Sequence, residues 1–183
     1  MNTHIMLDIE TLGTGSNSLV LGIGAVEFSL SGATFRQFSI NLPVLEQILN
    51  PNVQVDVDTI SWWKLQSNEA KLSLLKKKPA KTVKEGLEAF SKFLTSFEEP
   101  PSLWGNGCTF DNAIIRNLYK AFGISFPLPF YADKDVRTIV DLIDYKKVKD
   151  KVAFTGTKHN AIDDCLYQVK LVAEGLKLLK ESK

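Results

Sequence analysis

Two acidic residues, Asp8 and Glu10, end a short apolar run near the start of the chain. The neighbouring Ile5, Leu7 and Ile9 predict a buried β-strand. Side chains two positions apart in a strand point to the same face, so both carboxylates would emerge together at the strand's end. Buried carboxylates repel each other unless a cation or hydrogen-bond donors satisfy them. The pair therefore indicates a metal site, although solvated acids on an edge strand would give the same pattern.

A third carboxylate, Asp111, precedes a segment with apolar residues at helical spacing. It lies three and four residues before Ile114 and Ile115, so it would face the core side of its helix. An unpartnered carboxylate is rarely kept on such a face. A capping aspartate that interacts with the helix dipole explains the position equally well. The helix alone leaves a buried ligand and a cap as equal alternatives.

His159 is one of two histidines in the chain, and it stands close to Asp163 and Asp164 at the head of the last predicted helix. An imidazole has a reference pKa of about 6.5, which suits proton transfer near neutrality. If His159 is itself helical, spacing places Asp163 rather than Asp164 on its side of the helix. The apolar stripe of the helix favours Asp164 only slightly, so spacing alone does not choose between the two acids.

The elements that must position these residues follow from the pattern of apolar residues. Residues 5–10, 19–28 and 34–40 predict strands, with a turn at Ser31-Gly32, and residues 102–104 predict a further short strand. Helical spacing predicts helices over residues 44–49, 59–66, 68–75, 82–97 with Thr82 as cap, 110–122, 135–145 and 159–179. Strands with helices packed around them indicate an α/β fold with a mixed sheet. Gly22-Ile23-Gly24 fits small residues in a packed strand better than a phosphate-binding loop, because no helix follows it.

Composition limits the function classes further. The chain has 183 residues, of which 44% are hydrophobic and 23% charged, so we expect one globular domain over residues 1–183. It lacks the roughly 18 consecutive apolar residues of a membrane span, and we expect a cytoplasmic protein without membrane contact. A net charge of +1 is not typical of a strongly basic nucleic-acid binder, although bound cations would add positive charge.

We assign no catalytic or binding role to two smaller features of the sequence. The lysine run at residues 76–78 is better explained as a solvated helix end than as a binding patch. Cys108 and Cys165 have neither the spacing of a zinc site nor the density of a disulfide scaffold, and we interpret both as small buried side chains.

Three motifs in this chain resemble those of the DEDDh exonucleases, a family with a ribonuclease-H-like fold of a mixed β-sheet flanked by α-helices. The motifs are Asp8-Ile9-Glu10-Thr11-Leu12-Gly13, the segment from Asn106 to Asp111, and His159-x-Ala161-x-x-Asp164. Within the family, three further segments are similar to a phage and bacterial subgroup that includes the phage T4 exonuclease A and a mycobacterial 3′→5′ exoribonuclease. These segments are Ile60-Ser61-Trp62-Trp63, Trp104-Gly105-Asn106-Gly107 and Asp135-Val136-Arg137-Thr138.

The resemblance implies a metal-dependent 3′→5′ exonuclease that hydrolyses single-stranded DNA or RNA ends, or short overhangs, to nucleoside 5′-monophosphates. Its metal ligands would be Asp8, Glu10, Asp111 and Asp164, which hold two divalent cations. Oxygen-only ligands suit Mg²⁺ or Mn²⁺. His159 would act as general base. The resemblance, rather than helical spacing, selects Asp164.

The resemblance also suggests substrate contacts. Thr11 and Leu12 would meet the terminal nucleotide, Phe110 would stack on a base, and Asn106 would line the site. Trp62 and Trp63 point about 100° apart on a helix, so we expect one to be buried and the other, taken as Trp62, to contact substrate or a partner chain. Core packing of both is the alternative.

Several functional alternatives stay open at this point. One is an endonuclease or nuclease-like transferase on the same fold. Another is a nucleic-acid-binding module that has lost its chemistry, which the intact set of acids argues against. The choice between DNA and RNA and the oligomeric state, a homodimer included, are also left open by the sequence.

Overall fold

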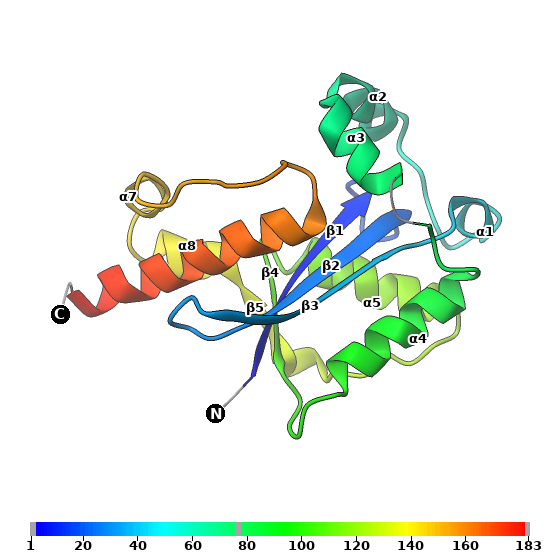
Figure 1. The fold of residues 1–183 in the computed structure, drawn as a ribbon. Coiled ribbons are helices and arrows are strands. Elements are labelled where there is room, and N and C mark those ends of the chain that lie inside the picture. The colour runs from blue at the N-terminus through cyan, green and yellow to red at the C-terminus, as the bar shows by residue number, and fades with distance from the viewer. Residues whose placement is uncertain (1–2, 76–77, 182–183) are drawn as a thin grey trace.

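The computed structural model describes residues 3–75 and 78–181. Its centre is a mixed five-stranded sheet with the strand order β3-β2-β1-β4-β5 (Figure 1). The strands are β1 (His4–Thr11), β2 (Val20–Phe28), β3 (Thr34–Asn41), β4 (Ser102–Gly105) and β5 (Asp133–Asp135). β1, β2 and β3 form an antiparallel meander, whereas β4 lies parallel to β1 and β5 lies parallel to β4. The predicted α/β class with a mixed sheet is confirmed.

Helices cover both faces of the sheet, with α4 and α5 on one side and α8 on the other (Figure 1). The helices are α1 (Val44–Ile48), α2 (Val57–Leu65), α3 (Asn68–Leu75), α4 (Val83–Leu94), α5 (Asp111–Ala121), α6 (Val136–Asp141), α7 (Tyr145–Lys149) and α8 (Ala161–Glu181). α4 begins after Thr82, whose side chain accepts the N–H of Glu85 at 3.0 Å, as the predicted cap requires. None of the helices in the described residues is both long and apolar enough to cross a membrane.

Alternation along β1 divides the core into two layers. Ile5, Leu7 and Ile9 pack with α4 and α5, while Met6 packs in a second cluster with the apolar face of α8. Because successive strand side chains point to opposite faces, the acids at even positions share the α8 face with Met6. β1 lies in the middle of the sheet, so the alternative of solvated acids on an edge strand is wrong.

The largest difference from the predicted elements lies between residues 133 and 149. The single helix predicted over residues 135–145 is wrong, because Asp135 ends β5 and caps α6, which stops at Asp141. A separate helix, α7, begins after Asp144, whose backbone φ of 143° breaks the helical path. Of the two cysteines, Cys165 is buried as predicted, whereas Cys108 is only half-buried. Residues 76 and 77 of the lysine run lie outside the described residues.

Candidate active site

An open cleft of about 680 Å³ lies beyond the ends of β1 and β4. β1 supplies its floor, α2 supplies one wall, and the segment after β4 supplies another. α8 and the loop before it close the remaining side. Six carboxylates line this cleft: Asp8, Glu10, Asp56, Asp58, Asp111 and Asp164.

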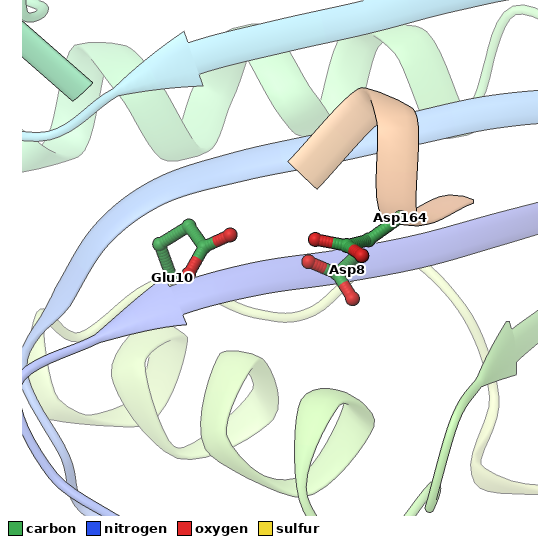
Figure 2. A group of neighbouring side chains, drawn as sticks. All are labelled: Asp8, Glu10 and Asp164. Atoms are coloured by element: carbon green, nitrogen blue, oxygen red, sulfur yellow. The ribbon is translucent and has the colours of Figure 1, made fainter. Parts of the chain in front are cut away.

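Three of these acids converge. Asp8, Glu10 and Asp164 each offer a carboxylate oxygen, and these oxygens lie within 4.8 Å of one another (Figure 2). Asp8 and Glu10 come from β1, and Asp164 comes from the first turn of α8. α8 can approach because Gly24, which pairs with Asp8 across the sheet, has no side chain. A Cβ at Gly24 would lie 2.6 Å from the Cβ of Ala161. Sheet register and one glycine therefore bring these three carboxylates together.

Asp111 lies beside this cluster but outside the group within 4.8 Å. Its Oδ1 accepts the backbone N–H of Ile9 at 3.3 Å. Pairing of β1 with β4 covers His4 to Met6, so Asp111 satisfies a strand N–H beyond that pairing. The cap position of α5 is occupied by Phe110 rather than by Asp111. The Asp111 side chain thus extends from α5 to the backbone of β1. Asp111 is therefore not the N-terminal cap of α5.

Burial raises the pKa of all four of these carboxyl groups. The pKa of Asp8 lies well above its usual range through burial and the charges of its acidic neighbours. Burial, with the nearby carboxylates, raises the pKa of Glu10 to about 8. Burial raises the pKa of Asp111 to about 7, despite donated backbone N–H groups and the charge of Arg137. It raises the pKa of Asp164 to about 6. Burial and mutual repulsion thus favour the protonated forms of these acids, and a bound cation would favour the ionised forms.

The two neighbouring acids of the third motif point in different directions. His159 lies just before α8 with a left-handed backbone φ of 62°, and its N–H donates to Asp164 Oδ2 at 2.8 Å. Asp163 faces away, because its Oδ2 accepts the N–H of Thr157 at 2.8 Å. Asn160 caps the helix by accepting the N–H of Asp163 at 3.3 Å. Since His159 precedes the helix, the spacing argument for Asp163 does not apply, and Asp164 is the one in the cluster.

The two tryptophans of α2 have different surroundings. Trp63 is 7% exposed, and its Nε1 donates to the backbone oxygen of Thr11 at 2.8 Å. Trp62 is 41% exposed and lines the cleft. The His159 ring lies edge-on to Trp62, with ring centroids 4.8 Å apart. Burial lowers the pKa of His159, and the charge of Lys158 lowers it further, so the imidazole is neutral at pH 7.

Not all of the remaining residues predicted to contact substrate line the cleft. Thr11, Asn106 and Phe110 line the cleft. Leu12 lies next to lining residues but is not one of them, and its backbone instead bonds to Leu19 and Asp56. The structure therefore brings three of these four residues to the cleft and leaves the Leu12 side chain outside its lining.

Gln168 belongs to none of the motifs identified in the sequence, yet it lines the cleft and contacts Asp8. Its Nε2 donates to Asp8 Oδ1 at 2.7 Å, and its buried Oε1 has no partner within the described residues. Gln168 lies four residues after Asp164, one helical turn along the same face, and this spacing was the available signal. Asp56 and Asp58, at the start of α2, were also missed because no pattern connected them with the acids of β1.

Known proteins resemble this chain in sequence and fold. The exodeoxyribonuclease of Enterobacteria phage T4 is 21% identical over 209 aligned residues, which cover 94% of this chain and 88% of the phage protein. The nuclease domain of 3′hExo, a DEDDh family member solved bound to rAMP, has a TM-score of 0.64 and 12% identity. That match covers 98% of this chain and 92% of the solved one.

A second solved structure, the cell-death related nuclease 4, matches with a TM-score of 0.63 and 14% identity. The match covers 97% of this chain but 64% of that nuclease, so the chain spans less than two thirds of its length. At these identities the two structures establish the ribonuclease-H-like fold. The family model described as the 3′-5′ exoribonuclease Rv2179c-like domain matches residues 3–176, which confirms the resemblance to the DEDDh exonucleases. The chain belongs to the Rv2179c-like 3′-5′ exoribonuclease domain family.

Proposed function

We propose that this chain is a two-metal 3′→5′ exonuclease that removes nucleotides one at a time from single-stranded DNA or RNA ends, or from short overhangs, as nucleoside 5′-monophosphates. The observation that carries the proposal is the convergence of carboxylate oxygens from β1 and α8 within 4.8 Å, in an open cleft. Membership of a 3′-5′ exoribonuclease family supports the polarity. The family match over residues 3–176 also supports a single exonuclease domain.

The cleft residues fit divalent cations. Asp8, Glu10, Asp111 and Asp164 would hold two ions, and their oxygen-only donor set suits Mg²⁺ or Mn²⁺. Burial raises the pKa of each of these acids, and bound cations would favour their ionised forms. When bound, the cations supply positive charge that stabilises the phosphate oxygens and acidifies the attacking water. Gln168 orients Asp8 through their 2.7 Å hydrogen bond.

His159 is the residue that we assign to proton transfer. Its ring lies at the edge of the cleft, half-buried and neutral, so it is ready to accept a proton from the attacking water. Two features hold it there: its backbone N–H donates to Asp164, and its ring packs edge-on against Trp62. As the bond between phosphorus and the 3′ oxygen breaks, the departing oxygen takes a proton from solvent, and the ring later returns its own proton to solvent.

The substrate strand would lie along the cleft. Phe110 offers an aromatic face for a base, and Trp62 offers a second surface on the opposite wall. Thr11 and Asn106 supply polar groups beside the metal ligands. These groups recognise features that DNA and RNA share, so the proposal includes both nucleic acids as substrates.

A digestion panel tests this function. Oligonucleotides of DNA and RNA, single- and double-stranded and labelled at the 5′ end, are incubated with the protein in Mg²⁺, Mn²⁺ or EDTA. We expect a ladder that shortens from the 3′ end, release of 5′-monophosphates, and no reaction in EDTA. Asp8→Ala protein, purified in the same way, controls for contaminating nucleases.

A circular single strand separates the main alternatives. An exonuclease leaves the circle intact, whereas an endonuclease linearises it. Cleavage of the circle, or shortening from the 5′ end, would overturn the proposal. Binding of oligonucleotides without any metal-dependent hydrolysis would instead support the inactive binding module.

A further inference from the structure

Arg137 is unusual among the side chains that line the cleft. Six of the lining residues are acids, whereas Arg137 is the single lysine or arginine among the lining residues in the described ranges 3–75 and 78–181. Even two bound divalent cations, with a combined charge of +4, would leave this acidic lining net negative. A polyanionic strand that enters the cleft therefore meets Arg137 as a fixed positive charge of the protein.

Arg137 also differs from the other arginines of the chain. Arg36 forms an ion pair with Glu27 at 2.7 Å, and Arg116 pairs with Asp133 at 2.8 Å. Within the described part of the chain, no carboxylate forms an ion pair with Arg137. Its guanidinium donors thus remain available for an anion from outside the protein.

The local backbone fixes the place of Arg137. Asp135, the cap of α6, accepts the N–H of Thr138 at 3.2 Å and the N–H of Cys108 at 2.5 Å. The start of α6 is thereby tied to the turn after β4. That turn contains Gly107 with a φ of 105°, where a Cβ would lie 3.2 Å from Arg137 Cζ. The guanidinium therefore lies against the bare backbone of the turn, which a side chain at Gly107 would obstruct.

Sheet geometry places Arg137 to one side of the metal ligands. Asp135 pairs with Gly105 of β4, and β4 in turn pairs with β1, so Arg137 follows a strand two positions from β1. The side chain of Arg137 reaches back from there to the turn after β4, so its guanidinium lies beside the neighbouring strand of β1, about one strand spacing of 5 Å from it. Thr11, by contrast, lies beyond Asp8 along β1 itself. The Thr11 end and the Arg137 side of the cleft therefore lie in different directions from the carboxylates.

We propose that Arg137 binds the phosphate on the 5′ side of the scissile phosphate and so selects substrates that continue beyond the terminal nucleotide. The inference rests on the proposed exonuclease function and adds a residue that recognises the strand upstream. With the terminal nucleoside at the Thr11 end and the scissile phosphate over the carboxylates, the next phosphate comes nearest to Arg137. A guanidinium binds two phosphate oxygens at once, which a lysine ammonium does not reproduce.

Two substrates that differ in upstream phosphates test this assignment. Thymidine 5′-(p-nitrophenyl phosphate) contains only the scissile phosphate, whereas the trinucleotide dTpTpT contains one more on its 5′ side. We expect Arg137→Ala to raise the KM for the trinucleotide about tenfold or more, the usual worth of a charge-assisted hydrogen bond. Its effect on the ester should stay several times smaller. Arg137→Lys should recover part of the loss.

Lys120→Ala is the matched control, because Lys120 is exposed on α5 and does not line the cleft. For longer oligonucleotides, Arg137→Ala should reduce the slope of log affinity against log salt by about one, whereas Lys120→Ala should leave it unchanged. Equal losses on both substrates, or a fall in melting temperature that accounts for the loss, would overturn the assignment. An unchanged KM for the trinucleotide would do the same.

Failure of the proposed function gives a different result. If the unaltered protein hydrolyses neither substrate in Mg²⁺ or Mn²⁺, the exonuclease proposal fails. The role of Arg137 is then decided by the Kd for fluorescently labelled dTpTpT measured in Ca²⁺, which requires no turnover. A Kd that is the same for the Arg137→Ala and unaltered proteins would refute the role.

Discussion

The carboxylate side of the cleft is built on the sheet, whereas its aromatic side is a separate helix, α2, attached at the end of the central strand. Asp8 and Glu10 stand on the central strand, and α8 rests directly on β2 at Gly24. α2 is attached differently: Trp63 donates to the Thr11 carbonyl, and the N–H of Asp56 donates to the Leu12 carbonyl at 2.7 Å. Both attachments lie at the C-terminal end of β1, at its last residue and the one that follows.

This difference in attachment matches two different requirements, one for holding cations and one for contacting a nucleic-acid strand. Groups that hold cations tolerate little displacement, because coordination depends on short distances between several oxygens. A wall that contacts a flexible strand tolerates more, because stacking on an aromatic face is insensitive to base identity. Exposed apolar residues on α2, such as Val57 at 73% and Leu65 at 85%, show how loosely that helix is covered compared with α8. We therefore expect changes on the carboxylate side to affect turnover and changes on the α2 side to affect binding.

The largest expected effect comes from removing one acid of the carboxylate side. Asp8→Ala or Asp111→Ala should abolish hydrolysis, because each removes a proposed cation ligand. Without metal, the melting temperature should change little, because the relief of repulsion among buried carboxylates offsets the loss of the hydrogen bond from Gln168 or from Ile9. Turnover assays in Mg²⁺ and calorimetric unfolding in EDTA measure the two effects. Near-native turnover in either variant would contradict the two-metal assignment.

The neighbours on α8 provide a matched pair on the same side. Asp164→Asn should eliminate activity, whereas Asp163→Asn should reduce it modestly, because an amide oxygen accepts the N–H of Thr157 less strongly than a carboxylate does. Both changes remove one charge from the same helical turn, so the pair separates position from charge. The reverse order of activities in a Mg²⁺-dependent assay would show that Asp163 is the ligand.

A smaller loss of activity is expected from changing His159, which lies between the carboxylate side and the aromatic side of the cleft. His159→Ala should lower the rate by roughly 10²–10⁴, the usual worth of a positioned acid–base group, with little change in cation affinity. Isothermal titration with Mn²⁺ and single-turnover rates distinguish these quantities. Loss of Mn²⁺ affinity with an unchanged rate at saturating metal would identify His159 as a ligand instead.

The aromatic side should respond in binding and stability. Trp62→Ala should weaken oligonucleotide binding by about 1–3 kcal/mol, the worth of one stacked base, at nearly constant kcat. Trp63→Phe should instead lower the free energy of unfolding by about 1–3 kcal/mol, because it leaves the Thr11 carbonyl unpaired. KM measurements and urea denaturation test the pair. Equal stability losses with unchanged affinity would assign both tryptophans to packing.

The smallest effect concerns pH. Because the folded protein raises the pKa of Glu10 to about 8, of Asp111 to about 7 and of Asp164 to about 6, it binds protons that the unfolded chain has lost. Their contribution to stability is complete below about pH 4 and is lost as pH rises through the folded values. The metal-free melting temperature should therefore fall by a few degrees between pH 5 and 9. Stabilisation by Mg²⁺ should grow over the same range, and a metal-free melting temperature that rises would contradict this sign.

Elements with strong periodicity could be predicted from the sequence. Alternating apolar residues identified the first three strands, and Thr82 marked the start of α4. β5 could not be found, because Asp133-Lys134-Asp135 has neither apolar alternation nor β-branched residues. The break between α6 and α7 depends on the left-handed backbone of Asp144, which the apolar pattern does not encode.

In the candidate site, too, some residues could be predicted from the sequence and others could not. His159 and four of the six acids were identifiable because they occur in motifs, whereas Asp56 and Asp58 do not. The orientation of Asp164 and the place of Gln168 depend on how closely α8 approaches the sheet, which Gly24 permits through a contact between residues far apart in the chain. The position of Leu12 depends on the path of its loop, and residue type alone does not determine that path.

The backbone conformation of His159 restricts which residues can replace it, independently of the chemistry of its ring. A φ of 62° is costly for most side chains, and asparagine and glycine adopt it more easily than alanine does. Replacing His159 by alanine therefore removes the imidazole and also makes this backbone conformation less favourable. A change in that conformation would displace the N–H that donates to Asp164. An asparagine variant would keep that backbone geometry while losing the base. Comparing the two variants separates a missing proton acceptor from a displaced carboxylate. Transfer of this motif to another scaffold would need the loop conformation as well as the residue.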